Sequence, residues 1–235
     1  MAHRLRKLSV GLTSTAPLLR ARELYRFYHA GDDETFALRG VSAEVKAGEI
    51  VAVVGPSGSG KSTLLACLAG LDEPDGGHVI VAGQRITRRP EATRAALRAR
   101  WIGILLQSGN FVDHLSVTQN IQMAQALVKN RTSRQPGGLL AEVGLAERAG
   151  ARPSTLSGGE AARAALAVAL ANDPPVLLAD EPTGEVDDEA QGRVLDLLRR
   201  RAAEGNAVLV VTHSEGVAAV ADRILHIVDG KVTHD

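Results

Sequence analysis

The sequence of 235 residues lacks three features that would each point to a particular class of protein. It has one cysteine, Cys67, which excludes an intrachain disulfide and a cysteine-built metal site and fits a reducing cytosol. Its 27 basic and 27 acidic residues cancel, so no global field attracts a polyanion and nucleic acid is not an expected partner. The longest uninterrupted apolar stretch, residues 164–171, is much shorter than the ~20 residues that span a bilayer.

The length suits one large α/β domain better than two independent ones. At the N-terminus, Arg4, Arg6 and Lys7 precede a mildly apolar segment, but small polar residues interrupt that segment, unlike in a signal peptide. We therefore interpret residues 1–20 as a flexible basic extension and residues 21–235 as a single domain.

Three short apolar segments, residues 50–54, 176–179 and 207–211, are typical of strands buried on both faces of a parallel sheet. The first is followed by a glycine-rich turn and then by leucines with helical spacing, so it predicts a strand, a loop and a helix. A further helix is expected between the second and third strands, where Val194, Leu197 and Leu198 give it an apolar face. The core is therefore predicted to be a parallel sheet covered by helices.

Two other parts of the domain have different patterns. Residues 39–45 and 78–86 alternate small apolar residues with glycine and polar residues, which indicates half-exposed antiparallel strands. We expect a small antiparallel β layer over about residues 22–50 and 76–88. From about 90 to 170 the composition turns to Ala, Leu, Arg and Gln, which predicts a helical insertion with a loop at 131–138.

The glycine-rich turn GPSGSGKST fits the phosphate-loop pattern GxxxxGK[ST], and it has the required strand before it and helix after it. In such a loop several backbone N–H groups converge on phosphate oxygens, and glycines allow the close approach. We expect Lys61 to bind the β and γ phosphates and Ser62 to bind magnesium. The predicted nucleotide-binding residues here are Gly55, Pro56, Ser57, Gly58, Ser59, Gly60, Lys61, Ser62 and Thr63.

Polar residues at the ends of other apolar strands complete a predicted catalytic site. Asp180 and Glu181 end one strand and are expected to hold magnesium and to polarise the attacking water, respectively. His213 follows another strand and should lie near the γ phosphate. Gln107 ends the run 102–106, where its amide could orient water or magnesium.

The string LSGGE at residues 156–160 precedes an alanine-rich helix, so Ser157, Gly158 and Gly159 would form an anion-binding helix start. A second anion site makes sense if it closes over the nucleotide of a neighbouring chain, with two ATPs between two head-to-tail subunits. A simple helix cap of serine and glycine would also explain LSGGE alone.

These motifs occur in the order found in ABC-transporter ATPases, and the chain resembles that family over about residues 22–235. The resemblance implies a P-loop NTPase with a RecA-like, largely parallel core, a small antiparallel β subdomain and an inserted α-helical subdomain. It makes residues 55–63 the Walker A loop, Gln107 the Q-loop glutamine, LSGGE the signature, and Asp180 and Glu181 the Walker B pair. His213 becomes the switch histidine, Asp187 the D-loop aspartate at the subunit interface, and ATP with Mg²⁺ the cofactor.

The resemblance also places an adenine-stacking aromatic at Tyr28, although Tyr25 or Phe27 could take that role, or Tyr28 could belong to the core. Within the family, LDEPDGG, RWIGILLQ, ADEPTG and VTHS resemble the macrolide-exporter, lipoprotein-release and cell-division branch. That branch implies a second ATPase chain, identical or related, and membrane permease subunits with extracytoplasmic domains. It places the chain at the cytoplasmic face of the inner membrane, with residues 111–120 as the candidate membrane contact.

Some positions depart from this branch: Ala161 and Ala162 replace the usual glutamines, Val168 a usual arginine, and Glu185 a common asparagine. All predicted phosphate and metal ligands are intact, and a pair with a different chain stays open. Alternatives are a regulator like the cell-division member, a non-transport ABC ATPase and a small-molecule kinase. A chromosomal ATPase would need a long coiled-coil insertion and a ribosomal one two cassettes, while a kinase would leave LSGGE unexplained. The transported substrate cannot be read from the sequence.

Overall fold

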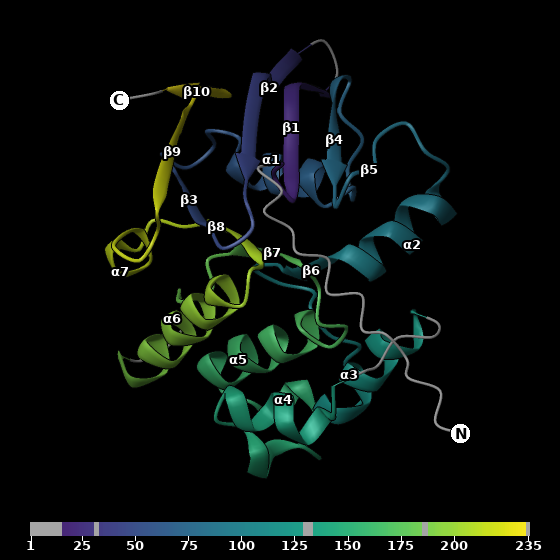
Figure 1. Cartoon of the computed structure of the whole chain (residues 1–235), viewed down its shortest axis with the longest axis vertical. Coiled ribbons are helices and arrows are strands. Elements are labelled where there is room, and N and C mark those ends of the chain that lie inside the picture. The colour runs from purple at the N-terminus through teal and green to yellow at the C-terminus, as the bar shows by residue number, and fades with distance from the viewer. Residues whose placement is uncertain (1–15, 31–32, 129–133, 185–187, 234–235) are drawn as a thin grey trace, which may run out of the picture.

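The computed structural model describes residues 16–30, 33–128, 134–184 and 188–233. Its N-terminal part contributes to an antiparallel four-stranded sheet in the order β2-β1-β4-β5 (Figure 1). These strands are β1 (Leu19–Ala30), β2 (Asp33–Val45), β4 (Gly76–Val81) and β5 (Gln84–Arg85). The predicted antiparallel layer is therefore present, but β1 begins before residue 21. Leu19 and Arg20, assigned above to the extension, pair with Val45 and Glu44.

A second sheet has six strands in the order β10-β9-β3-β8-β7-β6, and it is parallel except where β10 pairs with β9. The three apolar segments predicted to be buried strands are the central ones, because strands without a polar face must be covered on both sides. The strands are β3 (Ile50–Val54), β6 (Ile102–Leu105), β7 (Val176–Asp180), β8 (Ala207–Val211), β9 (Arg223–Val228) and β10 (Lys231–Thr233).

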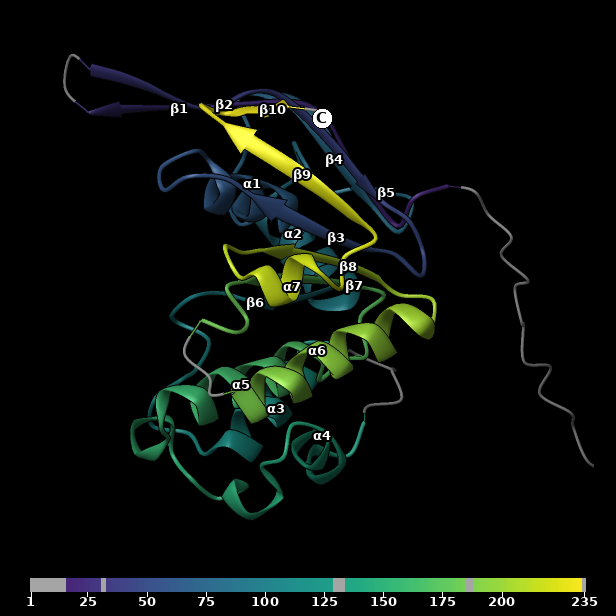
Figure 2. The same cartoon turned by 90° about the vertical axis from the view of Figure 1, so that its left-hand side faces the viewer.

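The parallel sheet separates two apolar cores. Successive residues of a strand point to opposite faces, so Leu178 and Leu209 belong to one core while Leu177 and Val208 belong to the other. The first core lies between the two sheets and includes helix α1, and the second lies between the parallel sheet and the helical layer (Figure 2). The nucleotide motifs therefore stand on a layer that is fixed from both sides.

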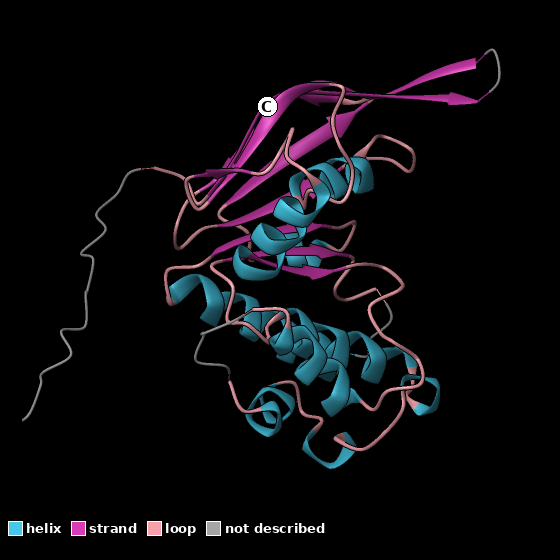
Figure 3. Ribbon diagram, turned by 90° about the vertical axis from the view of Figure 1, so that its right-hand side faces the viewer, coloured by secondary structure: helices cyan, strands magenta, loops and turns pink. Residues whose placement is uncertain are grey.

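Helices lie on both faces of the parallel sheet, and the lower part of the molecule is helical (Figure 3). They are α1 (Lys61–Leu68), α2 (Glu91–Trp101), α3 (Val117–Ala126), α4 (Pro136–Glu142), α5 (Gly158–Ala169), α6 (Asp188–Ala203) and α7 (Glu215–Ala218), with 3₁₀ turns at Ala146–Arg148 and Pro153–Thr155. Within the described residues no helix is long and apolar enough to cross a bilayer.

Two sequence-based boundaries in the helical region are wrong. The predicted insertion at about 90–170 includes β6, which pairs with β7 and belongs to the parallel core. The predicted loop at 131–138 includes the start of α4, since Pro136 occupies a first-turn position where its missing N–H costs nothing. The composition of a short strand between two helices did not distinguish it from its surroundings.

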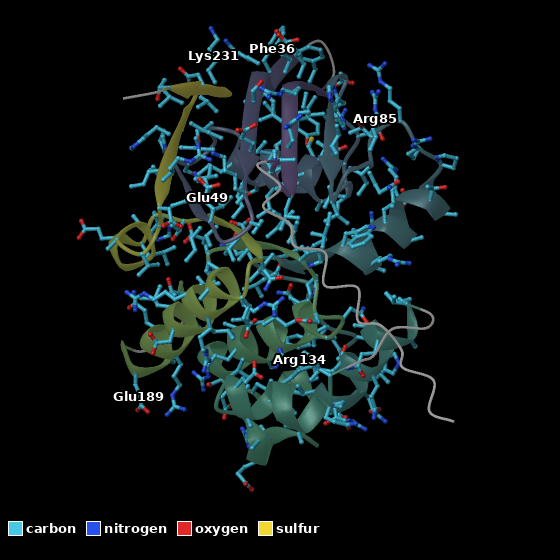
Figure 4. All side chains as sticks on the ribbon, in the orientation of Figure 1. Phe36, Glu49, Arg85, Arg134, Glu189 and Lys231 are labelled. Carbon is cyan, nitrogen blue, oxygen red and sulfur yellow. The ribbon has the colours of Figure 1, made fainter. Side chains whose placement is uncertain are left out.

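The two kinds of secondary structure lie at opposite ends of the molecule. Phe36 and Lys231 mark the β end, where the β1–β2 hairpin projects, and Arg134 and Glu189 mark the helical end (Figures 2 and 4). The edge of the parallel sheet where β3, β6, β7 and β8 terminate lies between these ends, so residues from both can reach it.

Cys67 provides a test of this core. Its side chain is fully buried in α1, and burial raises the pKa of the thiol to about 12. We expect a thiol reagent at pH 8 to label the native protein very slowly and the denatured protein at once. In the folded protein the reagent cannot reach the Cys67 sulfur, and the thiol is not ionised to the reactive thiolate. The measurement is labelling rate against guanidinium concentration. Rapid labelling without denaturant would contradict this packing of α1.

Candidate active site

The phosphate loop follows β3 and leads directly into α1. It is wedged between neighbouring strands, so two of its glycines have no room for a side chain. A Cβ on Gly60 would lie 2.3 Å from the Ala37 oxygen, and one on Gly55 would lie 2.1 Å from the Ile227 oxygen. Gly60 also has a φ of +102°, which favours glycine. The glycines therefore shape the loop against β2 and β9.

The first turn of α1 is suited to an anion. Its cap residue is Gly60, the first turn has no acidic side chain, and no side-chain cap hydrogen bond is present in this described segment. The backbone N–H groups and the helix dipole therefore point at the loop without a competing carboxylate. Lys61 lies over the loop and donates to the oxygens of Gly55 (2.9 Å) and Pro56 (2.8 Å), two of its three possible hydrogen bonds.

Ser62 and Asp180 meet at the base of the loop. The Ser62 hydroxyl donates to the Asp180 carboxylate at 3.1 Å, although the two residues come from α1 and the end of β7. Asp180 is buried, and this burial raises the pKa of its carboxyl group above the usual range. A hydroxyl and a carboxylate next to a phosphate loop are the hard oxygen donors that Mg²⁺ takes, and a cation would offset the burial cost of the carboxylate. The residues present therefore fit the implied ion.

Glu181 is the first residue after β7, and its backbone is in the left-handed region, with a φ of +49°. This conformation is uncommon for a residue with a side chain and is often found at functional sites. The Glu181 N–H donates to the Val211 oxygen at 2.9 Å, so the turn is fastened to the end of β8. The carboxylate is thereby directed toward the residues that follow β8.

Both oxygens of the Glu181 carboxylate are held by that segment. His213 Nδ1 lies 2.7 Å from one oxygen, and the Thr212 hydroxyl donates to the other at 3.1 Å. The His213 side chain is 80% exposed and the Glu181 side chain only 14%, so the histidine faces solvent over the carboxylate. Thr212 is fully buried and also accepts from the Ser214 N–H.

Thr212 contacts Glu181, and the sequence reasoning did not assign it to the site. It lies within the string VTHS, where a hydroxyl directly before the histidine was visible. The hydrogen bond from Thr212 to Glu181 could not be predicted, because it joins residues 31 positions apart.

Gln107 and the acidic pair border one cavity of about 330 Å³. Gln107 follows β6 and is exposed, and its loop is closed by Asn110, which bonds both the N–H and the oxygen of Leu106. Asn110 is a second residue that sequence reasoning did not assign. The cavity lining is Leu105, Leu106, Gln107, Ser108, Gly109, Asn110, Phe111, Gly158, Ala161, Ala162, Asp180, Glu181, Pro182, Gly184 and His213.

The LSGGE string begins α5 with a capping box. Ser157 accepts from the Glu160 N–H at 3.2 Å, and the Glu160 carboxylate accepts from the Ser157 N–H at 2.9 Å. Arg148 pairs with Glu160 at 2.9 Å, and the Arg148 hydrogen bond is the main reason that the pKa of Glu160 is lowered. The helix-cap interpretation is therefore correct within the chain. The Ser157 hydroxyl still carries its own hydrogen, which an anion could accept.

Tyr28 lies near the end of β1, and its hydroxyl donates to Asp72 at 2.8 Å. It is 41% exposed, so the alternative of a core residue does not describe it. Tyr25 and Phe27 line a separate cavity with Phe36 and Arg39. Asp187 and Glu185 lie outside the described residues.

A larger groove of about 520 Å³ lies beside the active-site cavity and shares Leu106, Gly109 and Asn110 with it. Its lining is mostly apolar and comes from α2, β6, α3 and α5, with exposed Leu71 and Leu127 among its residues. Phe111, from the predicted membrane contact, instead packs against the core of the helical layer.

Comparisons with known proteins agree with these motifs. A family model described as ABC transporter matches residues 38–184. Among curated relatives, the macrolide export ATP-binding/permease protein MacB of Hyphomonas neptunium is 40% identical over 224 residues, 94% of this chain. The protein with the same description from Burkholderia thailandensis is 42% identical over 226 residues. This chain spans only 35% and 34% of those two proteins.

Solved structures support the fold. The chain is similar to MJ0796, described as a bacterial ABC transporter cassette in a dimeric structure, with a TM-score of 0.87 and 32% identity. The match covers 92% of this chain and 97% of that one. A post-hydrolysis state of the same cassette bound to ADP and Pi matches equally well. The chain therefore belongs to the ABC transporter family and carries its ATPase cassette.

Proposed function

We propose that this ABC ATPase cassette binds ATP with Mg²⁺, pairs head-to-tail with a second cassette, and drives an export or mechanotransmission complex through permease parts that lie in the membrane. The observation that carries the hydrolytic part is the attachment of Glu181 to Thr212 and His213 at the rim of the phosphate loop. The name of the relatives, which couples ATP binding to macrolide export, supports the exporter part.

ATP binding would use the loop and the helix start described above. The free N–H groups of α1 receive the phosphate oxygens, and Lys61 turns from the loop carbonyls toward the β and γ phosphates. Ser62 and Asp180 would hold Mg²⁺, which neutralises phosphate charge when bound. Tyr28 offers its exposed ring to the adenine.

Hydrolysis requires a base that faces the γ phosphate. Glu181 is suited to accept a proton from the attacking water, since Thr212 and the left-handed backbone fix its direction before ATP arrives. His213 can stabilise the carboxylate or contact the γ phosphate from the open side. Gln107 borders the same cavity and can orient the water from the helical side.

The second cassette would complete the site. The LSGGE helix start of one chain presents Ser157, Gly158 and Gly159 as anion ligands, while its own phosphate loop already serves one nucleotide. A closed pair places two ATPs between two such surfaces. The dimeric structure of the similar cassette MJ0796 supports this arrangement.

The apolar groove between α2, α3 and α5 is the surface that we assign to the membrane subunits. It has exposed leucines and shares part of its wall with the loop that carries Gln107. A rearrangement of the active-site cavity would therefore change the surface that a partner in the groove contacts. We propose this groove in place of residues 111–120, because Phe111 is partly buried and packs against the core of the helical layer. The complex would lie at the cytoplasmic face of the inner membrane.

Glu181→Gln should still bind ATP and form a closed dimer, but its hydrolysis rate should fall by about 10²–10⁴, as expected for the loss of a general base. Phosphate release measures the rate, and size-exclusion chromatography with ATP measures the dimer. Glu215→Gln, an exposed carboxylate on α7, serves as the control. Near-normal turnover of Glu181→Gln would remove Glu181 from its role.

Thr212→Val should lower kcat by about tenfold and leave KM unchanged, because it removes the charge-assisted hydrogen bond to the base, and the one accepted from the Ser214 N–H, without touching ATP. Thr212→Ser keeps the hydroxyl and should restore most of the rate. Steady-state kinetics of both variants test this. Equal rates for valine and serine would show that the hydroxyl does not position Glu181.

The membrane partner can be identified with a tagged Glu181→Gln chain purified with ATP from solubilised membranes of its source. Mass spectrometry should find a membrane protein with an extracytoplasmic domain. A second substitution in the groove, Leu127→Arg, should abolish recovery of this membrane protein. The control Ile224→Arg, which changes an exposed apolar residue on β9, should not. Recovery of soluble partners alone would point to a non-transport ATPase.

A further inference from the structure

The turn between α1 and β4 carries the string LDEPDGG, which the phosphate chemistry does not use. Two of its carboxylates, Asp72 and Asp75, form hydrogen bonds with residues of β1. These contacts converge on the residues around Tyr28. We name residues 71–75 the acidic turn.

The acidic turn is fastened to the end of α1. The N–H groups of Leu71 (2.9 Å) and Asp72 (3.2 Å) both donate to the Ala66 oxygen, and Gly70 has a left-handed φ of +65° that closes the helix. The position of the Asp72 carboxylate is therefore fixed relative to α1. The same helix begins at Lys61, so one short rigid element joins the acidic turn to the phosphate loop.

Asp72 holds two side chains of β1 at once. Arg26 donates to both of its oxygens at 2.8 Å, in a bidentate ion pair, and the Tyr28 hydroxyl donates to one of them at 2.8 Å. Asp75 adds a second ion pair to Arg26 at 3.2 Å and accepts from the Phe27 N–H at 2.8 Å. The two carboxylates therefore hold β1 at three successive residues, Arg26, Phe27 and Tyr28.

Arg26 also covers the Tyr28 ring. Its guanidinium carbon lies 4.7 Å from the ring centroid, a cation–π contact. The Arg26 side chain is only 22% exposed, whereas Tyr28 is 41% exposed. The ring therefore has one side covered by Arg26, a hydroxyl bonded to Asp72 and a substantial exposed surface.

We propose that Asp72 and Arg26 are positioning residues for the nucleotide base: through α1 they set the Tyr28 ring at a fixed place relative to the phosphate loop. This inference rests on the proposed stacking of adenine on Tyr28. Its physical basis is preorganisation, because a ring already held in one rotamer loses little entropy when a base stacks on it. The effect should act on the base and not on the phosphates.

A double-mutant cycle tests the proposal, with dissociation constants for ATP and for tripolyphosphate as the readout. Tyr28→Ala should weaken ATP binding about tenfold, a typical loss for one base–aromatic stack, and leave tripolyphosphate unchanged. Asp72→Ala should weaken ATP about three- to tenfold, also without an effect on tripolyphosphate. The double variant should bind ATP no more weakly than Tyr28→Ala, because Asp72 acts only through Tyr28.

Conservative variants and kinetics separate positioning from a loss of structure. Arg26→Lys keeps a cation near the ring but loses the bidentate pair with Asp72, so its ATP affinity should fall between those of the native chain and Arg26→Ala, while Arg26→Ala should resemble Asp72→Ala. The KM for ATP should rise with kcat unchanged at saturation. Glu73→Ala is the matched control, since Glu73 is in the same turn but pairs with Arg94 of α2.

The outcomes distinguish the two ideas. If Tyr28→Ala leaves ATP affinity unchanged, the stacking role itself fails, and the positioning proposal fails with it. If Tyr28→Ala weakens ATP but Asp72→Ala does not, or if the two losses add fully, only the positioning proposal fails. Equal losses for ATP and tripolyphosphate in Asp72→Ala would show general damage to the loop and overturn it as well.

Discussion

The active site depends on the register of the parallel sheet at the level where its strands end. Two backbone hydrogen bonds continue the ladder past the strands: Thr212 N–H to the Val53 oxygen at 3.1 Å, and Glu181 N–H to the Val211 oxygen at 2.9 Å. They align the segments after β3, β8 and β7, which carry the phosphate loop, the histidine and the acidic pair. A shift of one residue would reverse the faces of the buried side chains, so the two cores enforce this register.

Helix α1 extends that alignment toward the antiparallel sheet. Its first turn faces the phosphate loop, its buried face fills the core between the sheets, and its C-terminal end carries the acidic turn. The antiparallel layer is therefore more than a cover, because β1 is tied to the same helix that shapes the phosphate site. Burial of short apolar segments stabilises the arrangement, while the ion pairs on β1 direct individual side chains.

Three of the four positions that depart from the family pattern line two cavities. Ala161 and Ala162 line the cavity beside Glu181, and Val168 lines the apolar groove. The alanines leave more room beside Glu181 than glutamines would, and Val168 makes the groove wall less polar than an arginine would. All three residues belong to α5, the helix that LSGGE begins, so one helix contributes to the walls of both cavities.

Local patterns in the sequence determined the strands β3, β7 and β8, the phosphate loop, and the residues that end each strand, since these signals depend only on neighbouring residues. The identity of the family could be read in the same way. Boundaries were less certain where local signals conflict, as at β6 between helices and at the first turn of α4.

Contacts between distant residues were decided only by the tertiary structure. Three sets of hydrogen bonds join residues 31 to 118 positions apart. They link Thr212 to Glu181, Ser62 to Asp180, and both Arg26 and Tyr28 to Asp72. The sequence determined which chemical groups are present, because motif spacing is local. Their pairing depended on how sheets and helices pack, since a hydrogen bond needs a distance and a direction that no spacing along the chain supplies.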